Sequence, residues 1–238
     1  MQRYFVTRIV NEEVIFEKEQ IHHIVNVMRM RVNDQITVVY NGEAFLATIK
    51  STNPFKVIVE ENLHEDHELH NHITLLYCIP KGEKLDLVIQ KATELGVSEI
   101  VLVQSERCIA KITKENKEKK LIRFNKIALE ASEQSKRTKV PTINQVIDYK
   151  DISKFKFDHA YIAYEDEGEI SFKDKIEKIK EGETIGIIIG SEGGFSKKEV
   201  EYAILNNYQS VSLGKRILRS ETAVFYALTC FSLLLERK

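Results

Sequence analysis

The sequence predicts an α/β protein in which a small N-terminal β-domain precedes a larger domain built on a parallel sheet. Residues 1 to about 62 consist of short β runs with turn signals between them. After a polar stretch, apolar runs alternate with helical patterns, and these runs lack the polar–apolar alternation of a half-exposed sheet. At 238 residues the chain is long enough for one or two such domains.

The N-terminal region predicts a compact β-barrel. Asn41-Gly42 is a strong hairpin signal between two of its β runs. The segment 60–72 is polar throughout and is typical of a linker, so we place the domains at 1–70 and 71–238. The predicted strands are 35–40, 44–49 and 56–60.

The second region predicts strands and helices in alternation. Its first helix has apolar residues on one face and stops at Gly96. The predicted strands are 73–78, 100–103, 161–164, 184–189 and 210–214. The predicted helices are 84–95, 114–135, 171–180, one from Ser196 and one from Glu221.

Composition predicts a protein of the reduced cytoplasm without a membrane segment. The longest apolar stretch, 223–235, is shorter than a membrane span, and Cys78, Cys108 and Cys230 are too few and too scattered for a disulfide framework. The net charge of −1 does not by itself indicate a nucleic-acid partner.

The stretch IGSEGGFSKKEVE, residues 189–201, places three glycines between a strand and a helix. Ser196 and Glu199 have the spacing of a capping box. One interpretation is a tight turn, and the other is a loop whose backbone approaches a small ligand. The loop matches neither the P-loop nor the dinucleotide-binding fingerprint.

Four histidines occur between 64 and 72, and a metal site there is one hypothesis. Because these residues lie in a polar linker without a rigid element, we expect a solvated linker and no metal. No G-x-S-x-G motif supports a serine hydrolase.

Basic residues gather between Lys111 and Lys139 and near the N-terminus, where arginines accompany Tyr4 and Phe5. Such runs are usually solvated faces, but guanidinium, amide and aromatic groups together also suit contacts to RNA bases and phosphates. The candidate RNA-binding residues are Arg3, Arg8, Arg29, Arg31, Gln134 and Lys136.

The segment LGKRILRSETA, residues 213–223, follows a strand and begins an apolar helix. Ser220 as the helix cap and Glu221 at its positive end explain two of these residues. They do not explain the cations Lys215, Arg216 and Arg219.

These segments together resemble the RsmE family of 16S rRNA (uracil-N3)-methyltransferases, of the SPOUT class. The resemblance rests on HHIVNVMRM with YNGEAF, QKATELGV with SERC, ALEASEQSKR with VP, and IGSEGGFS with LGKRILRSETA, and it spans nearly the whole chain. Ser191 and Lys215 stand where the family commonly has proline, which affects the expected loop shape.

The resemblance implies a PUA-like barrel, a C-terminal SPOUT domain with a deep trefoil knot, and a homodimer that acts on 16S rRNA of the small ribosomal subunit. It also implies S-adenosylmethionine (SAM) as the cofactor, with the glycines allowing close approach. We expect the dimer interface on the final helix, with Phe225, Leu228 and Leu235 on one face, unless the protomer's own core covers them. The implied SAM-binding residues are Tyr164, Ile189, Gly190, Gly193, Gly194, Leu213, Gly214, Leu218 and Thr222.

Methylation of uracil N3 requires a group that accepts the N3 proton and a group that stabilises negative charge on the base oxygens. Arg219 or Arg137 is the candidate cation, and Glu133 or Glu221 the candidate base. Alternative functions are a related SPOUT methyltransferase acting on another RNA base or on ribose 2′-OH, and a catalytically silent RNA-binding or ribosome-assembly module.

Overall fold

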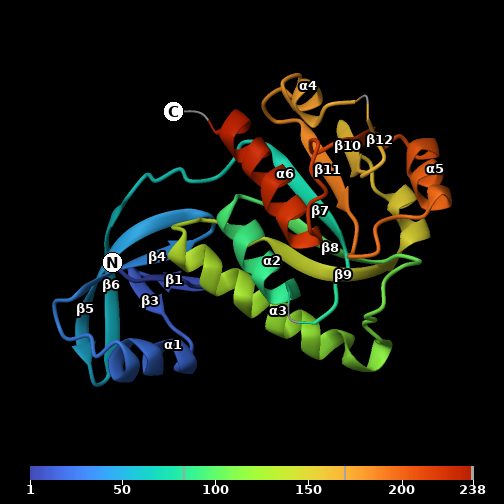
Figure 1. Ribbon diagram of the computed structural model, residues 1–238. Coiled ribbons are helices and arrows are strands. Elements are labelled where there is room, and N and C mark those ends of the chain that lie inside the picture. Colours follow the sequence, from blue (N-terminus) through green and yellow to red (C-terminus); the bar gives the residue numbers. More distant parts are fainter. Residues whose placement is uncertain (83, 169, 237–238) are drawn as a thin grey trace. The chain divides into compact units, whose positions relative to one another are not determined.

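The computed structural model describes residues 1–82, 84–168 and 170–236, and these form two compact units (Figure 1). Unit 1 contains residues 1–68 together with 132–139, and unit 2 contains the rest of the described chain. The segment 132–139 was expected with the second domain, but it makes most of its contacts with the first.

Unit 1 is built on one six-stranded sheet in the order β1-β4-β5-β6-β3-β2. The pair β1–β4 is parallel, and the other pairs are antiparallel. Asn41 and Gly42 both have positive φ, of 51° and 82°, as the predicted hairpin turn requires. The strands are β1 (Arg3–Phe5), β2 (Arg8–Val10), β3 (Glu13–Ile15), β4 (Gln35–Tyr40), β5 (Glu43–Thr52) and β6 (Phe55–Asn62).

A short helix, α1 (Lys18–His22), leads directly into a π-helical turn, η1 (His23–Val27). Ile24 is fully buried in the core of unit 1, whereas Val27 and Met28 are exposed. Single π-helical turns are uncommon and often occur at functional sites. The sequence did not indicate these two elements.

Unit 2 contains a six-stranded sheet in the order β12-β10-β11-β7-β8-β9, and every neighbouring pair is parallel. The predicted parallel sheet is therefore confirmed. The one strand that the sequence did not indicate, β9, lies at an edge and has several exposed residues. The strands are β7 (His72–Cys78), β8 (Glu99–Gln104), β9 (Thr142–Asp148), β10 (His159–Ala163), β11 (Thr184–Ile189) and β12 (Gln209–Val211).

The helices of unit 2 follow the predicted order, but two predicted ends differ and the 3₁₀ turn η2 was not predicted. Helix α4 ends at Ile176, four residues earlier than predicted, and strand β12 ends at Val211 and leaves 212–219 as a loop. The remaining elements are α2 (Lys84–Glu94), α3 (Lys114–Gln134, whose end belongs to unit 1), the 3₁₀ turn η2 (Tyr149–Lys154), α5 (Lys197–Leu205) and α6 (Ser220–Leu235).

Helix α6 lies beside α2 and against the sheet of its own unit (Figure 1). Leu228 is fully buried and Leu235 almost so, and Phe231 meets Phe172 edge-on at 5.2 Å. The expected interface face is therefore wrong for Leu228 and Leu235, because the core of the same unit covers them. The apolar residues that α6 exposes are Tyr226, Leu233 and Leu234. Within the described residues, no helix is long and apolar enough to cross a membrane.

Candidate cofactor and active site

A cavity of about 300 Å³ opens at the carboxyl ends of β10, β11 and β12. Ligands of open parallel sheets bind at this edge, because the loops that leave the strands converge there. Three loops supply the wall, one after each strand. The lining residues are Ala163, Tyr164, Glu165, Ile189, Gly190, Ser191, Glu192, Gly194, Phe195, Ser212, Leu213, Gly214, Ile217, Leu218, Arg219, Ser220 and Ala223.

The glycine loop needs glycine where it turns. Gly194 has φ of +63°, and a Cβ there would lie 3.1 Å from a carboxylate oxygen of Glu165. At Gly193 a Cβ would lie 2.9 Å from the Cβ of Arg107. The loop therefore requires glycine at both positions, because a side chain at either would meet a neighbouring residue and Gly194 also has left-handed backbone.

The loop ends in the predicted capping box. The Ser196 hydroxyl accepts from the N–H of Glu199, and the Glu199 carboxylate accepts from the N–H of Ser196. The buried carboxylate of Glu199 also accepts a 2.8 Å hydrogen bond from the N–H of Glu106. These bonds fix the start of α5 against the loop that follows β8.

Helix α6 begins differently from the prediction. Its N-cap is Arg219, which makes no side-chain capping bond, and Ser220 is the first helical residue. The Ser220 hydroxyl instead donates to the carbonyl oxygen of Gly190 at 2.5 Å and lies 2.9 Å from the phenol oxygen of Tyr77. Burial raises the pKa of Tyr77, so this phenol stays neutral.

Two candidates for chemistry, Arg219 and Glu221, lie next to each other in sequence but have different surroundings. Arg219 lines the cavity and is exposed, and its guanidinium has no hydrogen-bond or ion-pair partner within the described residues. The carboxylate of Glu221 contacts Nζ of Lys84 at 3.2 Å, and Nζ also lies 3.1 Å from Glu192. Glu221 is therefore paired with Lys84 and not with Arg219.

Seven of the nine expected cofactor-binding residues line the cavity. The other two do not: Gly193 packs against Arg107, and Thr222 is exposed on α6. Sequence reasoning missed Glu165 and Glu192, although each is adjacent to an expected residue. The seven that line the cavity are Tyr164, Ile189, Gly190, Gly194, Leu213, Gly214 and Leu218.

Arg137 and Glu133, the other two catalytic candidates, belong to unit 1. The guanidinium of Arg137 is buried and donates through Nε and Nη2 to Glu68 at 3.1 and 2.6 Å. The backbone N–H groups of Thr138 and Lys139 donate to the same carboxylate. Glu133 is half-buried, and its charge adds to burial in raising the pKa of Tyr4.

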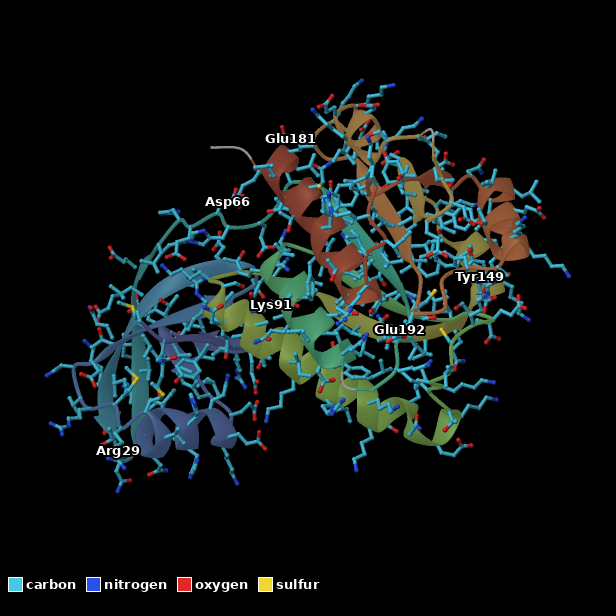
Figure 2. All side chains as sticks on the ribbon, viewed as in Figure 1. Arg29, Asp66, Lys91, Tyr149, Glu181 and Glu192 are labelled. Atoms are coloured by element: carbon cyan, nitrogen blue, oxygen red, sulfur yellow. The ribbon has the colours of Figure 1, made fainter. Side chains whose placement is uncertain are left out.

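Of the six expected RNA-binding residues, one is buried and five are exposed. Arg3 is 5 % exposed, is paired with Glu65, and donates to the carbonyl oxygens of Lys136 and Arg137. The other five side chains are exposed, and Figure 2 shows Arg29 extending from the surface of unit 1. These five are Arg8, Arg29, Arg31, Gln134 and Lys136.

The histidine segment does not assemble a metal centre within the described residues. His67 lies 3.4 Å from Glu65, and His70 lies 3.8 Å from Glu181. The carboxylates of this segment, Glu65 and Glu68, bind arginines instead.

The composition of the cavity fits SAM. Ile189, Leu213 and Leu218 offer apolar surface for a planar base, and peptide groups of the strand ends can bond to its polar edge. The carboxylates of Glu165 and Glu192 suit a ligand that carries an ammonium and a sulfonium charge.

Comparison with known proteins gives consistent matches over both parts of the chain. Residues 67–232 match the RNA methyltransferase domain family, and residues 16–61 match the RNA methyltransferase PUA domain. The ribosomal RNA small subunit methyltransferase E of Bacillus subtilis is 37 % identical, with 98 % of this chain and 96 % of the relative covered. That of Mesomycoplasma hyopneumoniae is 35 % identical, with 96 % and 98 % covered.

A solved structure extends this likeness to three dimensions. The ribosomal RNA small subunit methyltransferase E from Neisseria gonorrhoeae, bound to S-adenosyl methionine, superposes with a TM-score of 0.88. The two sequences are 29 % identical, and 98 % of each chain is covered.

Proposed function

This chain belongs to the ribosomal RNA small subunit methyltransferase E family, and from that premise we propose that it transfers the methyl group of SAM to N3 of a uridine in 16S rRNA. The single observation that carries the proposal is the cavity at the carboxyl edge of the parallel sheet. Its wall contains the guanidinium of Arg219, which no described residue pairs, and the carboxylate of Glu221 lies beside it.

The cavity is the proposed SAM site. Tyr164, Ile189, Gly190, Gly194, Leu213, Gly214 and Leu218 would hold the cofactor, and Glu165 and Glu192 would face its cationic part. When bound, SAM supplies an electrophilic methyl group on a positively charged sulfur. We expect binding without a metal ion, since the chemistry needs position and charge more than a Lewis acid.

The residues around the cavity would carry the proton and the charge. Glu221 accepts the proton of uracil N3, and the electron pair of N3 then forms the new N–C bond while the C–S bond breaks with its pair on sulfur. Arg219 donates hydrogen bonds to a uracil oxygen, where negative charge develops. Glu133 is the alternative base, and comparing Glu221→Gln with Glu133→Gln in a methyl-transfer assay decides between them. The buried pair with Glu68 favours a structural role for Arg137.

Unit 1 would bind RNA through its exposed arginines. Arg8, Arg29 and Arg31 are free to meet phosphates, and Val27 and Met28, exposed at the π-helical turn, offer an apolar surface to unpaired bases. Gln134 and Lys136 are exposed in the same unit and belong to the proposed surface. Affinity for rRNA should fall steeply with salt, and Arg29→Ala should reduce that slope.

We further propose the division into a PUA-like domain over 1–70 and a knotted SPOUT domain over 71–238, a homodimer, and a cytoplasmic location where ribosomal RNA is available. The apolar side chains that α6 exposes, Tyr226 and Leu233, support an interface on that helix. Tyr226→Asp should yield a monomer in light scattering. Leu205→Asp, at an 82 % exposed residue of α5, is the control and should leave the dimer intact.

Mass spectrometry of nucleosides tests the reaction. Purified protein, SAM and small-subunit rRNA should yield 3-methyluridine, and rRNA from cells that lack the protein should lose it. A different methylated nucleoside would replace the proposal with another base or with ribose 2′-OH as the target. SAM binding without any transfer would favour the silent RNA-binding module.

A further inference from the structure

Three elements of unit 2 bring charged side chains to one point beside the cavity. Lys84 begins α2, Glu192 lies in the glycine loop, and Glu221 is in the first turn of α6. Nζ of Lys84 lies 3.1 Å from Oε1 of Glu192 and 3.2 Å from Oε2 of Glu221. Both oxygens of Glu192 also accept from the backbone N–H of Lys81, at 3.3 and 3.2 Å.

The two carboxylates are close enough to need this cation. Because both contact the same nitrogen, their nearer oxygens are at most about 6 Å apart. Their side chains are only 27 % and 15 % exposed, so solvent screens them incompletely. Two carboxylates this close repel each other, and a cation that contacts both offsets the repulsion.

The pKa directions agree with this arrangement. Burial raises the pKa of Glu192, but hydrogen bonds from backbone N–H groups and from Lys84 outweigh it and leave that pKa below its usual range. Hydrogen bonds to Glu192 and Glu221 raise the pKa of Lys84. Both shifts favour the charged forms of Lys84 and Glu192.

Other groups that face the pair do not replace Lys84. Tyr77 of β7 is neutral and bonds to Ser220, and Lys81 contributes its backbone N–H. Arg219 lines the cavity, but no ion pair joins it to either carboxylate within the described part of the chain. Among the residues that the structure describes, Lys84 is the cation that contacts both.

We propose that Lys84 is a positioning residue for methyl transfer, whose ammonium holds the side chain of Glu192, in the cavity wall, and that of Glu221, beside the cavity. The inference rests on the proposed function, since it concerns the base that accepts the N3 proton. Without Lys84, Glu192 would lose a cation that lowers its pKa, and both side chains would gain rotational freedom. Glu221 would then be less well placed to accept the N3 proton.

The test compares Lys84→Met, Lys84→Arg and a matched control. Lys91 lies on the same helix, where Figure 2 labels it, and its ammonium contacts both oxygens of Glu94, at 2.8 Å each. Lys91→Met therefore removes a lysine–glutamate pair of similar exposure that does not line the cavity. For each protein, kcat/KM for rRNA methylation is measured between about pH 5 and about pH 9, together with SAM affinity by calorimetry and Tm.

We expect Lys84→Met to lower kcat/KM near neutral pH by about tenfold or more, and to move the acid limb of the profile to higher pH. Lys84→Arg should restore most of the rate and the original limb, because it returns a cation. Lys91→Met should match the wild type. A Lys84→Met protein with an unchanged limb and rate would overturn the inference, as would a loss that Lys84→Arg does not rescue.

A second measurement keeps this inference separate from the proposed function. Carboxyl ¹³C NMR titration of glutamate-labelled protein, assigned with Glu192→Gln and Glu221→Gln, reports the pair directly and needs no RNA. The Glu192 carboxyl should titrate at higher pH in Lys84→Met than in wild type, because the cation that lowers its pKa is gone. If the carboxyl titration differs between wild type and Lys84→Met as expected but the wild type methylates no rRNA, the proposed function fails and the role of Lys84 stands. If rRNA is methylated but the titration does not move, the role of Lys84 fails alone. If Lys84→Met does not fold, Glu192→Gln should still move the acid limb to lower pH, and an unmoved limb there would overturn the inference.

Discussion

The hydroxyl of Ser220 donates a 2.5 Å hydrogen bond to the carbonyl oxygen of Gly190 and thereby joins the first turn of α6 to the first residue of the glycine loop. The same hydroxyl lies 2.9 Å from the buried phenol oxygen of Tyr77. One small side chain thus connects the central strand β7, the loop that follows β11 and the helix that closes the cavity.

Replacing Ser220 by alanine should weaken both the fold and the cofactor site. The buried phenol of Tyr77 and the partly buried carbonyl of Gly190 would lose this partner, which should cost about 1–3 kcal/mol in the free energy of unfolding, measured with urea. SAM affinity, measured by calorimetry, should fall because the loop is less well fixed. Ser153→Ala is the control, since that hydroxyl bonds to Lys150 at an exposed position. Equal effects of the two variants would contradict the connecting role.

Gly194→Ala should reduce SAM affinity more than its backbone strain alone explains. Gly194 and Gly182 both have positive φ, of 63° and 79°, so alanine at either should cost about 1 kcal/mol of stability. Only at Gly194 would the new methyl group meet Glu165 in the cavity wall. Calorimetry should show weaker SAM binding for Gly194→Ala and unchanged binding for Gly182→Ala; equal affinities would refute the proposed contact.

The sequence predicted the parallel sheet because its strands are continuous apolar runs between helical patterns. Strands 73–78 and 184–189 were placed to within one residue, since burial on both faces leaves a clear signal. The edge strand β9 was missed because only Ile143 of its seven residues is buried, so it lacks a continuous apolar run. The end of α4 was misplaced because lysines and glutamates continue a helical pattern beyond Ile176.

The cavity was predictable in part, because the glycine loop and the loop before α6 both follow strands of one sheet. The individual ion pairs could not be predicted from the sequence. Lys84 and Glu221 are 137 residues apart, and Arg137 and Glu68 are 69 apart. No local spacing indicates such partners, so a buried, paired arginine and an exposed arginine in a cavity wall look alike in sequence.

Removing Glu68 should destabilise the protein strongly. Its partner Arg137 is 5 % exposed, and a buried charge left without its partner costs about 3–5 kcal/mol. Glu60→Ala breaks the exposed pair with Lys50 and should cost less than about 1 kcal/mol. Urea unfolding of Glu68→Ala and Glu60→Ala compares the two, and a similar small loss in both would argue against a structural role for Arg137.

The pair of Glu65 with Arg3 should contribute stability that depends on pH. Burial raises the pKa of Glu65, but the hydrogen bond and charge of Arg3 outweigh it, so the folded-state pKa is lowered. The unfolded chain then binds the proton more readily, and this contribution is present above the unfolded value of about 4.3 and is lost as pH falls through the folded value. Glu65→Gln should flatten the pH dependence of unfolding below about pH 5. A slope identical to wild type would contradict the assignment.

Arg219→Ala should impair methyl transfer while leaving the fold intact. The side chain is exposed, lines the cavity and has no partner within the described residues, so its removal breaks no ion pair there. Losing one donor to the developing charge on uracil typically costs about 3 kcal/mol of transition-state stabilisation, or roughly a hundredfold in rate. Tm and SAM affinity should stay close to wild type, and single-turnover methylation of rRNA measures the rate.

A different role for Arg219 would be to fasten its loop through an ion pair with Glu221 or another carboxylate. Glu221 is paired with Lys84, and no ion pair joins Arg219 to a carboxylate within the described residues. Arg216→Ala provides the control, because Arg216 is exposed in the same loop but does not line the cavity. Arg216→Ala should leave the rate of the chemical step unchanged. Its RNA affinity can fall, because a positive charge that attracts phosphates is lost. Saturating RNA separates these effects, because it restores the rate of Arg216→Ala and leaves Arg219→Ala slow. Should both variants recover at saturating RNA, Arg219 would be a phosphate-binding residue and not a group that acts on the base.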